Sequence, residues 1–230
     1  IEKKEKEKQQ ILSVTKGQEK EYQKLIAERE KQAAVIRSAL FDLRDSKAIS
    51  FGVAYQYAKD ASAVTGVRPA VILGILREES NLGENVGTGN WKKDMHPTRD
   101  QPVFATLMAE LGLNPDSMPV SRKPSYGWGG AMGPAQFIPS TWVLYKDRIA
   151  KITGESPPNP WTPRTAIFAS ALLMADNGAD GGTRESERLA ALRYFAGWAN
   201  AKKTAYAFYG DDVMSFADEY QRGIDILEGN

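Results

Sequence analysis

The sequence contains no cysteine and a single histidine, and these two shortages exclude several kinds of active site. Without cysteine there is no disulfide framework, no thiolate zinc site and no thiol nucleophile. One histidine, His96, is too few for a histidine-based metal cluster and makes a Ser-His-Asp triad hard to build. His96 stands beside Pro97, so we expect it to be an ordinary loop residue.

The chain also lacks a strong net charge and a long apolar run. Lys and Arg number 30 against 29 Asp and Glu, which leaves a formal charge of +1. No overall field would therefore recruit nucleic acid or an anionic membrane surface. No run approaches the roughly 18 apolar residues of a transmembrane helix. The first residue is Ile rather than Met and no signal peptide is recognisable, so we expect a trimmed or processed product, and a missing signal does not argue for the cytoplasm.

Proline is missing from residues 1–46, and Gly17 is the one glycine there, while Lys, Glu and Gln are abundant. The remaining chain, residues 47–230, has a globular composition. A total of 230 residues, 42% of them hydrophobic, is enough for one buried domain and a smaller element. We therefore divide the protein into a helical segment, 1–46, and a globular domain, 47–230.

The second half of the first segment has a heptad spacing of alternating four and three residues. The positions are Tyr22, Ile26, Arg29, Ala33, Ile36, Leu40 and Leu43. Sustained for about three heptads, this spacing predicts a coiled-coil helix. Because so polar a helix cannot be stabilised by its own burial, we expect it to pair with another helix, in a homodimer or with a different protein. The alternative is a solvated single helix that packs on the globular domain at its C-terminal end.

The globular domain is predicted to be all-α, because helical periodicity recurs and strand signals are nearly absent. The expected helices span residues 51–65, 68–80, 103–111, 139–152, 163–177, 184–198 and 213–227. Between Gly83 and Gly130 the chain is rich in Gly, Pro, Asn and Asp and has one short predicted helix. A loop-rich insertion of this length in a compact domain is usually functional.

Two adjacent carboxylates, Glu78 and Glu79, stand at the end of the apolar helix 68–80. A carboxyl group there is partly withdrawn from water and can keep its proton near neutral pH, as a general acid must. Periodicity does not choose between them, since each follows buried positions of the helix at three or four residues. Neighbouring residues on a helix point about 100° apart, so only one of the two should enter a pocket.

Glu79-Ser80 and the segment 130–142, Gly-Ala-Met-Gly-Pro-Ala-Gln-Phe-Ile-Pro-Ser-Thr-Trp, resemble the two signature motifs of lytic transglycosylases with a lysozyme-like fold. Segments 159–163, 192–197 and 209–213 follow in the order of that family. The resemblance covers about residues 51–228 and leaves out the coiled-coil helix. It implies an all-α, lysozyme-like helical domain with a long loop-rich insertion. Without the resemblance, Gly130 to Phe137 would be a tight turn at a helix entry.

The resemblance further implies that Glu79 is the catalytic acid/base of a peptidoglycan-cleaving enzyme. The enzyme would cut the β-1,4 bond between N-acetylmuramic acid (MurNAc) and N-acetylglucosamine (GlcNAc) and leave 1,6-anhydro-MurNAc ends, with no metal and no organic cofactor. Ser80, Met132, Gln136 and Tyr194 would bind substrate, with Ser80 orienting the residues around the acid. Amides such as Gln136 suit N-acetyl and hydroxyl groups, and a tyrosine ring suits a sugar face.

One departure from the family pattern is Phe195, which stands where relatives usually have Asn. The loss of that amide favours an alternative, a non-catalytic peptidoglycan-binding or scaffold module. A second alternative is a lysozyme-type hydrolase of the same bond, which would need Glu84 or Asp94 to hold a water molecule opposite the acid.

A last pattern, from Asp176 to Glu187, resembles a calcium loop, but Gly178 occupies the third ligand position and an ordinary helix connection is favoured. We expect no metal. The expected partners are glycan strands and a helix of a cell-wall complex protein or of a second copy, not nucleic acid. With such a substrate we expect the protein outside the cytoplasmic membrane, in the periplasm or cell wall, alone or as part of a larger secreted or membrane-anchored protein.

Overall fold

The computed structural model describes residues 20–21, 23–25, 27–28, 31 and 48–229. Within these residues the regular structure is helical, and strand pairing is limited to isolated bridges. The predicted all-α fold is thereby confirmed. Most of the predicted coiled coil falls outside the described residues, so its pairing stays a prediction. No helix in the described part is both long and apolar enough to cross a membrane.

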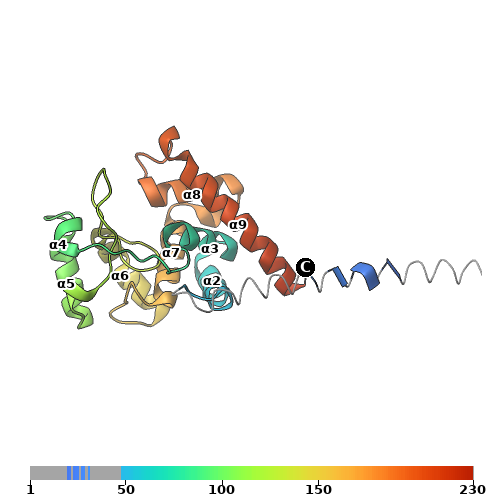
Figure 1. Ribbon diagram of the computed structural model, residues 1–230, viewed down its shortest axis with the longest axis horizontal. Coiled ribbons are helices and arrows are strands. Elements are labelled where there is room, and N and C mark those ends of the chain that lie inside the picture. Colours follow the sequence, from blue (N-terminus) through green and yellow to red (C-terminus); the bar gives the residue numbers. More distant parts are fainter. Residues whose placement is uncertain (1–19, 22, 26, 29–30, 32–47, 230) are drawn as a thin grey trace, which may run out of the picture.

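The globular domain consists of the elements α2 to α9, arranged as Figure 1 shows. The helices are α2 (Phe51–Thr65), α3 (Pro69–Ser80), α4 (Trp91–Asp94), α5 (Gln101–Leu111), α6 (Pro139–Thr153), α7 (Pro163–Asp176), α8 (Arg184–Ala196) and α9 (Ala207–Glu228). Short 3-10 turns are η2 (Pro115–Ser117), η3 (Ala179–Gly181) and η4 (Thr204–Tyr206). Helices α2, α3 and α7 lie centrally, with α4, α5 and α6 on one side and α8 and α9 on the other.

Helix α3 is the buried centre of the domain. Pro69 occupies its first turn, where a missing N–H costs nothing, and every residue from Ala70 to Leu76 is buried. Its glycine, Gly74, lies so close to α9 that an added Cβ would be 2.7 Å from the Val213 carbonyl oxygen. The helix ends at Asn81, whose left-handed backbone closes the last turn. The two glutamates therefore lie at the end of a buried helix.

Helix α9 begins earlier than the sequence suggested. We predicted a start at about Val213, whereas the helix starts at Ala207 and includes Gly210, a poor helix former. Gly210 is helical because α8 crosses there, and an added Cβ would meet the Leu192 and Arg188 side chains at 3.0 to 3.1 Å. Close helix packing therefore outweighs the low propensity of glycine, and it adds a turn that carries Tyr209.

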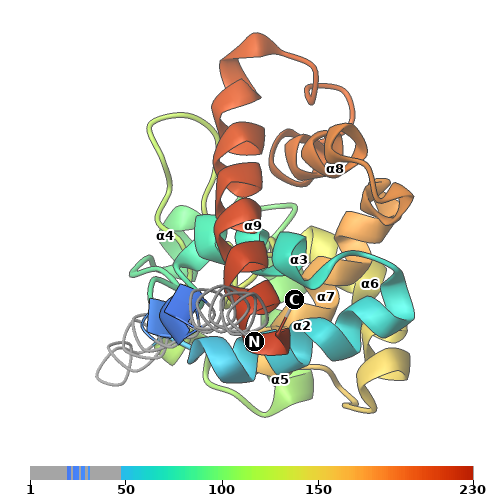
Figure 2. The same ribbon diagram turned by 90° about the vertical axis from the view of Figure 1, so that its right-hand side faces the viewer.

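The insertion between α3 and α6 is held together by backbone contacts. Gly89 pairs with Val120, and Val120 pairs in turn with Met132, each as an isolated bridge. The Asp94 carboxylate accepts hydrogen bonds from the Asn90 and Lys123 amides at 2.6 and 2.8 Å. The short helix α4, which we did not predict, ends at this aspartate. In Figure 2 the yellow-green loop before α6 rises from the side that holds α4.

Candidate active site

Glu79 lies at the C-terminal end of α3, near Tyr209 and Tyr194. Its carboxyl group accepts a short hydrogen bond from the Tyr209 hydroxyl of α9. Burial raises the pKa of Glu79 to about 7, an effect that the Tyr209 hydrogen bond opposes and the nearby Glu78 charge reinforces. A carboxyl group with this pKa is protonated about half of the time at neutral pH. It can therefore serve both as an acid and as a base.

Glu78 has a different environment from its neighbour. It is half-buried, and burial, with a smaller contribution from the Asp212 charge, raises its pKa. The residue before it, Arg77, pairs with Glu219 at 2.8 Å and stacks over the Phe216 ring. Of the two glutamates, Glu79 is the one bonded to Tyr209, which decides the question that helical periodicity left open.

Tyr194 of α8 approaches Glu79 from the other side. Its hydroxyl donates a 2.5 Å hydrogen bond to the Ala135 carbonyl oxygen, and its ring meets the Phe137 ring edge-on with centroids 6.0 Å apart. Burial, and next the Glu79 charge, raise the pKa of Tyr194 well above its ordinary value. The residue thus joins α8 to the Gly-rich turn before α6 while its ring lies beside the acid.

The turn from Gly130 to Phe137 is fixed against the acid by Ser80. The Ser80 hydroxyl donates to the Pro134 carbonyl oxygen at 2.6 Å and accepts from the Gly83 amide at 2.8 Å. Gly133 has φ +64°, and an added Cβ would lie 1.9 Å from the Pro160 carbonyl oxygen. Ser80 is buried and fully engaged, so its place in the structure is that of a support for the site.

The two remaining predicted contact residues differ in position. Met132 has no exposed surface and packs in the core, while its backbone amide donates to Phe137. The structure therefore puts Met132 beneath the turn and not along the groove, because its side chain faces inward. Gln136 is partly exposed, has φ +50°, and donates from its side-chain amide to the Gly133 carbonyl oxygen at 2.8 Å.

A groove of about 490 Å³ extends from Gln136 along the insertion. It is lined by Gly83, Glu84, Asn85, Val86, Gly87, Thr88, Pro119, Ser121, Arg122 and Gln136. Its volume is within the range of ligand-binding sites. Two residues of its wall also contact the turn beside the acid. The Gly83 amide donates to the Ser80 hydroxyl, and the Gln136 side chain donates to the Gly133 carbonyl oxygen. The acid and the groove are therefore linked through one turn.

Tyr209 is the site residue that sequence reasoning missed. Its ring is stacked on Phe195, with centroids 4.5 Å apart and planes 15° apart. Tyr206 and Phe208 pack their edges against the same Phe195 ring. Burial first, and then Glu79, raise the pKa of Tyr209 well above its ordinary value. The available signal was its place at the start of the segment 209–213, which follows the family's order.

The carboxylates considered for a hydrolytic mechanism are placed differently. Glu84 lines the groove, is exposed, and accepts a 2.5 Å hydrogen bond from the Asn81 amide. The Asp94 carboxylate is occupied by two backbone amides, and chiefly the Lys123 amide lowers its pKa. Asp94 thus holds the insertion in shape, and Glu84 is the freer of the two.

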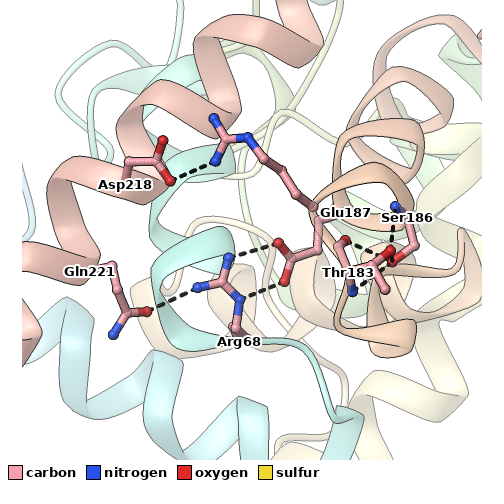
Figure 3. A network of polar contacts seen from close by, with 7 residues as sticks. Arg68, Thr183, Ser186, Glu187, Asp218 and Gln221 are labelled. Atoms are coloured by element: carbon pink, nitrogen blue, oxygen red, sulfur yellow. Dashed lines mark hydrogen bonds and ion pairs between the residues drawn. The ribbon is translucent and has the colours of Figure 1, made fainter.

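The segment resembling a calcium loop has its terminal carboxylates turned to arginines. Asp176 pairs with Arg148 at 2.5 Å. Glu187 is fully buried and forms two hydrogen bonds with Arg68, at 2.6 and 2.7 Å, as Figure 3 shows. Within the described residues, no group of three or more His, Cys, Asp or Glu side chains is placed to hold a metal. These contacts correspond to a helix connection.

No protein-family profile matches the chain. No curated protein matches it either. Among solved structures, the soluble lytic transglycosylase SltB1 from Pseudomonas aeruginosa is similar at 25% identity and a TM-score of 0.43, over 54% of this chain and 43% of that one. The Escherichia coli lytic transglycosylase Slt35 in complex with bulgecin A is similar at 20% identity and a TM-score of 0.44, over 66% and 48%.

A 36 kDa muramidase/transglycosylase is similar at 21% identity and a TM-score of 0.45, over 66% of this chain and 48% of that one. The chain thus spans less than half the length of these proteins. The likeness is partial at these TM-scores, so the assignment of a function depends on the geometry of the site. The structural neighbours of the chain are soluble lytic transglycosylases.

Proposed function

We propose that the domain is a peptidoglycan lytic transglycosylase with Glu79 as its acid/base. The observation that carries the proposal is one partly buried carboxyl group, with a pKa of about 7, bonded to Tyr209, whose neighbour Ser80 accepts a hydrogen bond from Gly83 in the groove wall. Two-carboxylate hydrolases place the second group about 5 to 10 Å from the first. The carboxylate nearest in sequence, Glu78, has no contact that would make it such a partner.

In the proposed reaction, protonated Glu79 donates its proton to the glycosidic oxygen between MurNAc and GlcNAc. The bond from that oxygen to C1 of MurNAc breaks, and GlcNAc leaves with a new hydroxyl group. The Glu79 carboxylate then removes the proton from the C6 hydroxyl of MurNAc, whose oxygen bonds to C1 and closes the 1,6-anhydro ring. One group transfers one proton in each direction, so neither water nor a cofactor is consumed.

The surrounding residues support this sequence of steps. The Tyr209 hydroxyl stabilises the carboxylate that forms after the first transfer, because a hydrogen bond to the charged form favours it. Tyr194 offers a ring for a sugar face, Gln136 an amide for N-acetyl groups, and Ser80 fixes the turn between them. Met132 supports the turn by packing in the core beneath it.

A non-catalytic binding module is the second candidate, and Phe195 is the observation that favours it. The ring occupies a position where an amide could have bound substrate, and it stacks on Tyr209 instead. A hydrolase of the same bond is a third candidate, supported by Glu84 in the groove wall. In each case the proposed partner is the glycan strand and the proposed location is outside the cytoplasmic membrane. Pairing of residues 1–46 with another helix is a proposal from the heptads alone.

The test is digestion of purified peptidoglycan by the wild type and by Glu79→Gln, with the products identified by mass. Anhydro-muropeptides from the wild type alone would support the transglycosylase. Hydrated reducing ends would instead support the hydrolase. A lack of products from either form, together with equal binding of both to the polymer, would support the binding module.

A further inference from the structure

The groove beside Gln136 has a composition that suits a charged, extended ligand more than a sugar ring. Its lining is dominated by the loop from Gly83 to Thr88 and by the segment from Pro119 to Arg122. No aromatic residue is among the lining residues, although stacking on rings is how sugars are usually held. The opposite charges of Arg122 and Glu84 both face this space.

The floor of the groove is made of main chain. An added Cβ on Gly87 would lie 2.2 Å from the Val120 carbonyl oxygen, and one on Gly89 would lie 2.6 Å from the Ser121 carbonyl oxygen. The absence of side chains therefore lets the two segments touch along their backbones. The Gly89 amide donates to the Val120 carbonyl oxygen at 2.7 Å and fixes this contact. Main-chain groups beside such a seam can bond an extended backbone.

Arg122 has its charge available for a ligand. In the described part of the insertion, Lys92 pairs with Asp116 and Arg99 with Asp100, and Arg122 takes part in neither pair. Its charge acts at longer range on Asp94, whose oxygens are occupied by backbone amides. The side chain is exposed. A guanidinium group binds a carboxylate through two parallel hydrogen bonds, which makes it the side chain best suited to recognise one.

We infer that Arg122 binds a free carboxylate of the peptide attached to MurNAc, with that peptide lying in the groove from Gln136 to Arg122. The inference rests on the proposed function, and it makes peptide-bearing glycan the preferred substrate. Gly83 lines the groove and donates its amide to Ser80, the residue next to Glu79, so a muramoyl sugar beside Glu79 would direct its peptide into the groove. Glu84 on the same wall can accept amide or ammonium hydrogens of that peptide.

Lys123 provides a matched control for Arg122. It is the next residue, is exposed and has the same charge, but its amine lies over the Trp128 ring, 3.6 Å from the centroid, and Lys123 is not among the groove residues. Arg122→Gln and Lys123→Gln therefore remove the same charge from the same loop. Only the first removes it from the groove.

The experiment compares three forms of the same glycan strands: with peptides, with peptides removed by an amidase, and with peptide carboxylates converted to amides. On peptide-bearing strands we expect Arg122→Gln to lower kcat/KM about tenfold, and Lys123→Gln to match the wild type. On strands without peptides or with amidated carboxylates, all three proteins should be equally slow. Equal rates of wild type and Arg122→Gln on every substrate would overturn the inference, as would an equal loss on every substrate.

A failure of the proposed function gives a different result in the same experiment. If the wild type releases no product from any substrate, binding of Glu79→Gln to the three kinds of strand decides the inference alone. Tighter binding to peptide-bearing strands that is lost in Glu79→Gln combined with Arg122→Gln would support it. Equal binding to all three strands would exclude a carboxylate site.

Discussion

At the scale of the residue, the protonation of Glu79 governs the proposed activity. Burial raises its pKa to about 7, so the proton needed for the first step is lost as pH rises above that value. We expect the rate of product release to be level at acidic pH and to fall about tenfold per unit well above pH 7. Glu79→Gln should lose at least ~10²-fold at and below pH 7, and the difference from the wild type should shrink at alkaline pH. Glu78→Gln is the comparison: it should keep the activity at acidic pH and move the alkaline limb slightly to lower pH, because the Glu78 charge helps to raise the pKa of Glu79.

The same group should make stability depend on pH. Its folded pKa of about 7 lies above the ordinary value of 4.5, so the folded state holds the proton more tightly. The stability contributed by the neutral carboxyl group is present below about pH 4.5 and is lost as pH rises to about 7. We expect Glu79→Gln to be about 1 to 3 kcal/mol more stable than the wild type at alkaline pH and about equal at acidic pH. Urea unfolding at both pH values measures the difference, and an equal gain at both would refute the linkage.

Phe195 should influence the acid through Tyr209. Its ring covers one face of the phenol, and Phe195→Asn would admit water to Tyr209 and to the carboxyl group behind it. Because burial is the main cause of the raised pKa, we expect the alkaline limb of the activity profile to move to lower pH by about half a unit to one unit. Phe195→Tyr keeps a ring in place and should leave the limb unmoved. An unchanged limb in the Asn variant would show that the stacking does not shield the acid.

At the scale of the element, the Gly-rich turn before α6 depends on space as well as on backbone angle. Gly133 and Gly127 have similar positive φ values, +64° and +73°, but an added Cβ meets Pro160 at 1.9 Å in the first case and nothing within 4 Å in the second. Both alanine variants carry the left-handed strain, of about 1 kcal/mol. We expect Gly133→Ala to lower the melting temperature clearly more than Gly127→Ala and to reduce activity as well. If the two variants had equal melting temperatures and equal activities, the turn would be able to shift away from Pro160.

The helices themselves were predictable where apolar periodicity and end signals coincide. Pro69, Pro139 and Pro163 each stand at a helix start in the structure as in the prediction, and Gly66 ends α2. The start of α9 was wrong because Gly210 is helical only against α8, a contact between distant segments. The site was predictable as far as its motifs extend. Tyr209 was missed for the same reason as the start of α9, and the inward side chain of Met132 depends on packing that spacing does not encode.

At the scale of the whole molecule, an ion pair with a buried carboxylate joins the start of α3 to α8. Arg68, which precedes α3, forms two hydrogen bonds with Glu187 of α8 and a third with Gln221 of α9, at 3.0 Å (Figure 3). Since the Glu187 side chain is fully buried, loss of its charge leaves the guanidinium without its partner. The pair therefore fixes three helices in one arrangement.

We expect Glu187→Gln to lower the free energy of unfolding by about 1 to 3 kcal/mol, because charged hydrogen bonds to a buried carboxylate are lost while the remaining guanidinium, 39% exposed, stays hydrated. Arg184 and Asp218 form the comparison, because this pair joins the same two helices, α8 and α9, at 2.7 Å but is exposed on both sides. Asp218→Asn should cost about 1 kcal/mol or less. Chemical denaturation of both variants measures the contrast, and similar costs would mean that water reaches the inner pair.

The contact at Gly74 has a consequence for how a long polymer could enter the site. Helices α3 and α9 meet backbone to backbone there, so the spacing between Glu79 and Tyr209 cannot widen without separating the two helices over their whole contact. The insertion has no such helix packing, and it is held by isolated backbone bridges and by loop hydrogen bonds, among them those to Asp94 and that from Trp161 to Pro119. Opening of the site would therefore take place in the insertion, and the residues of the proposed proton transfer would stay in register while a glycan strand entered.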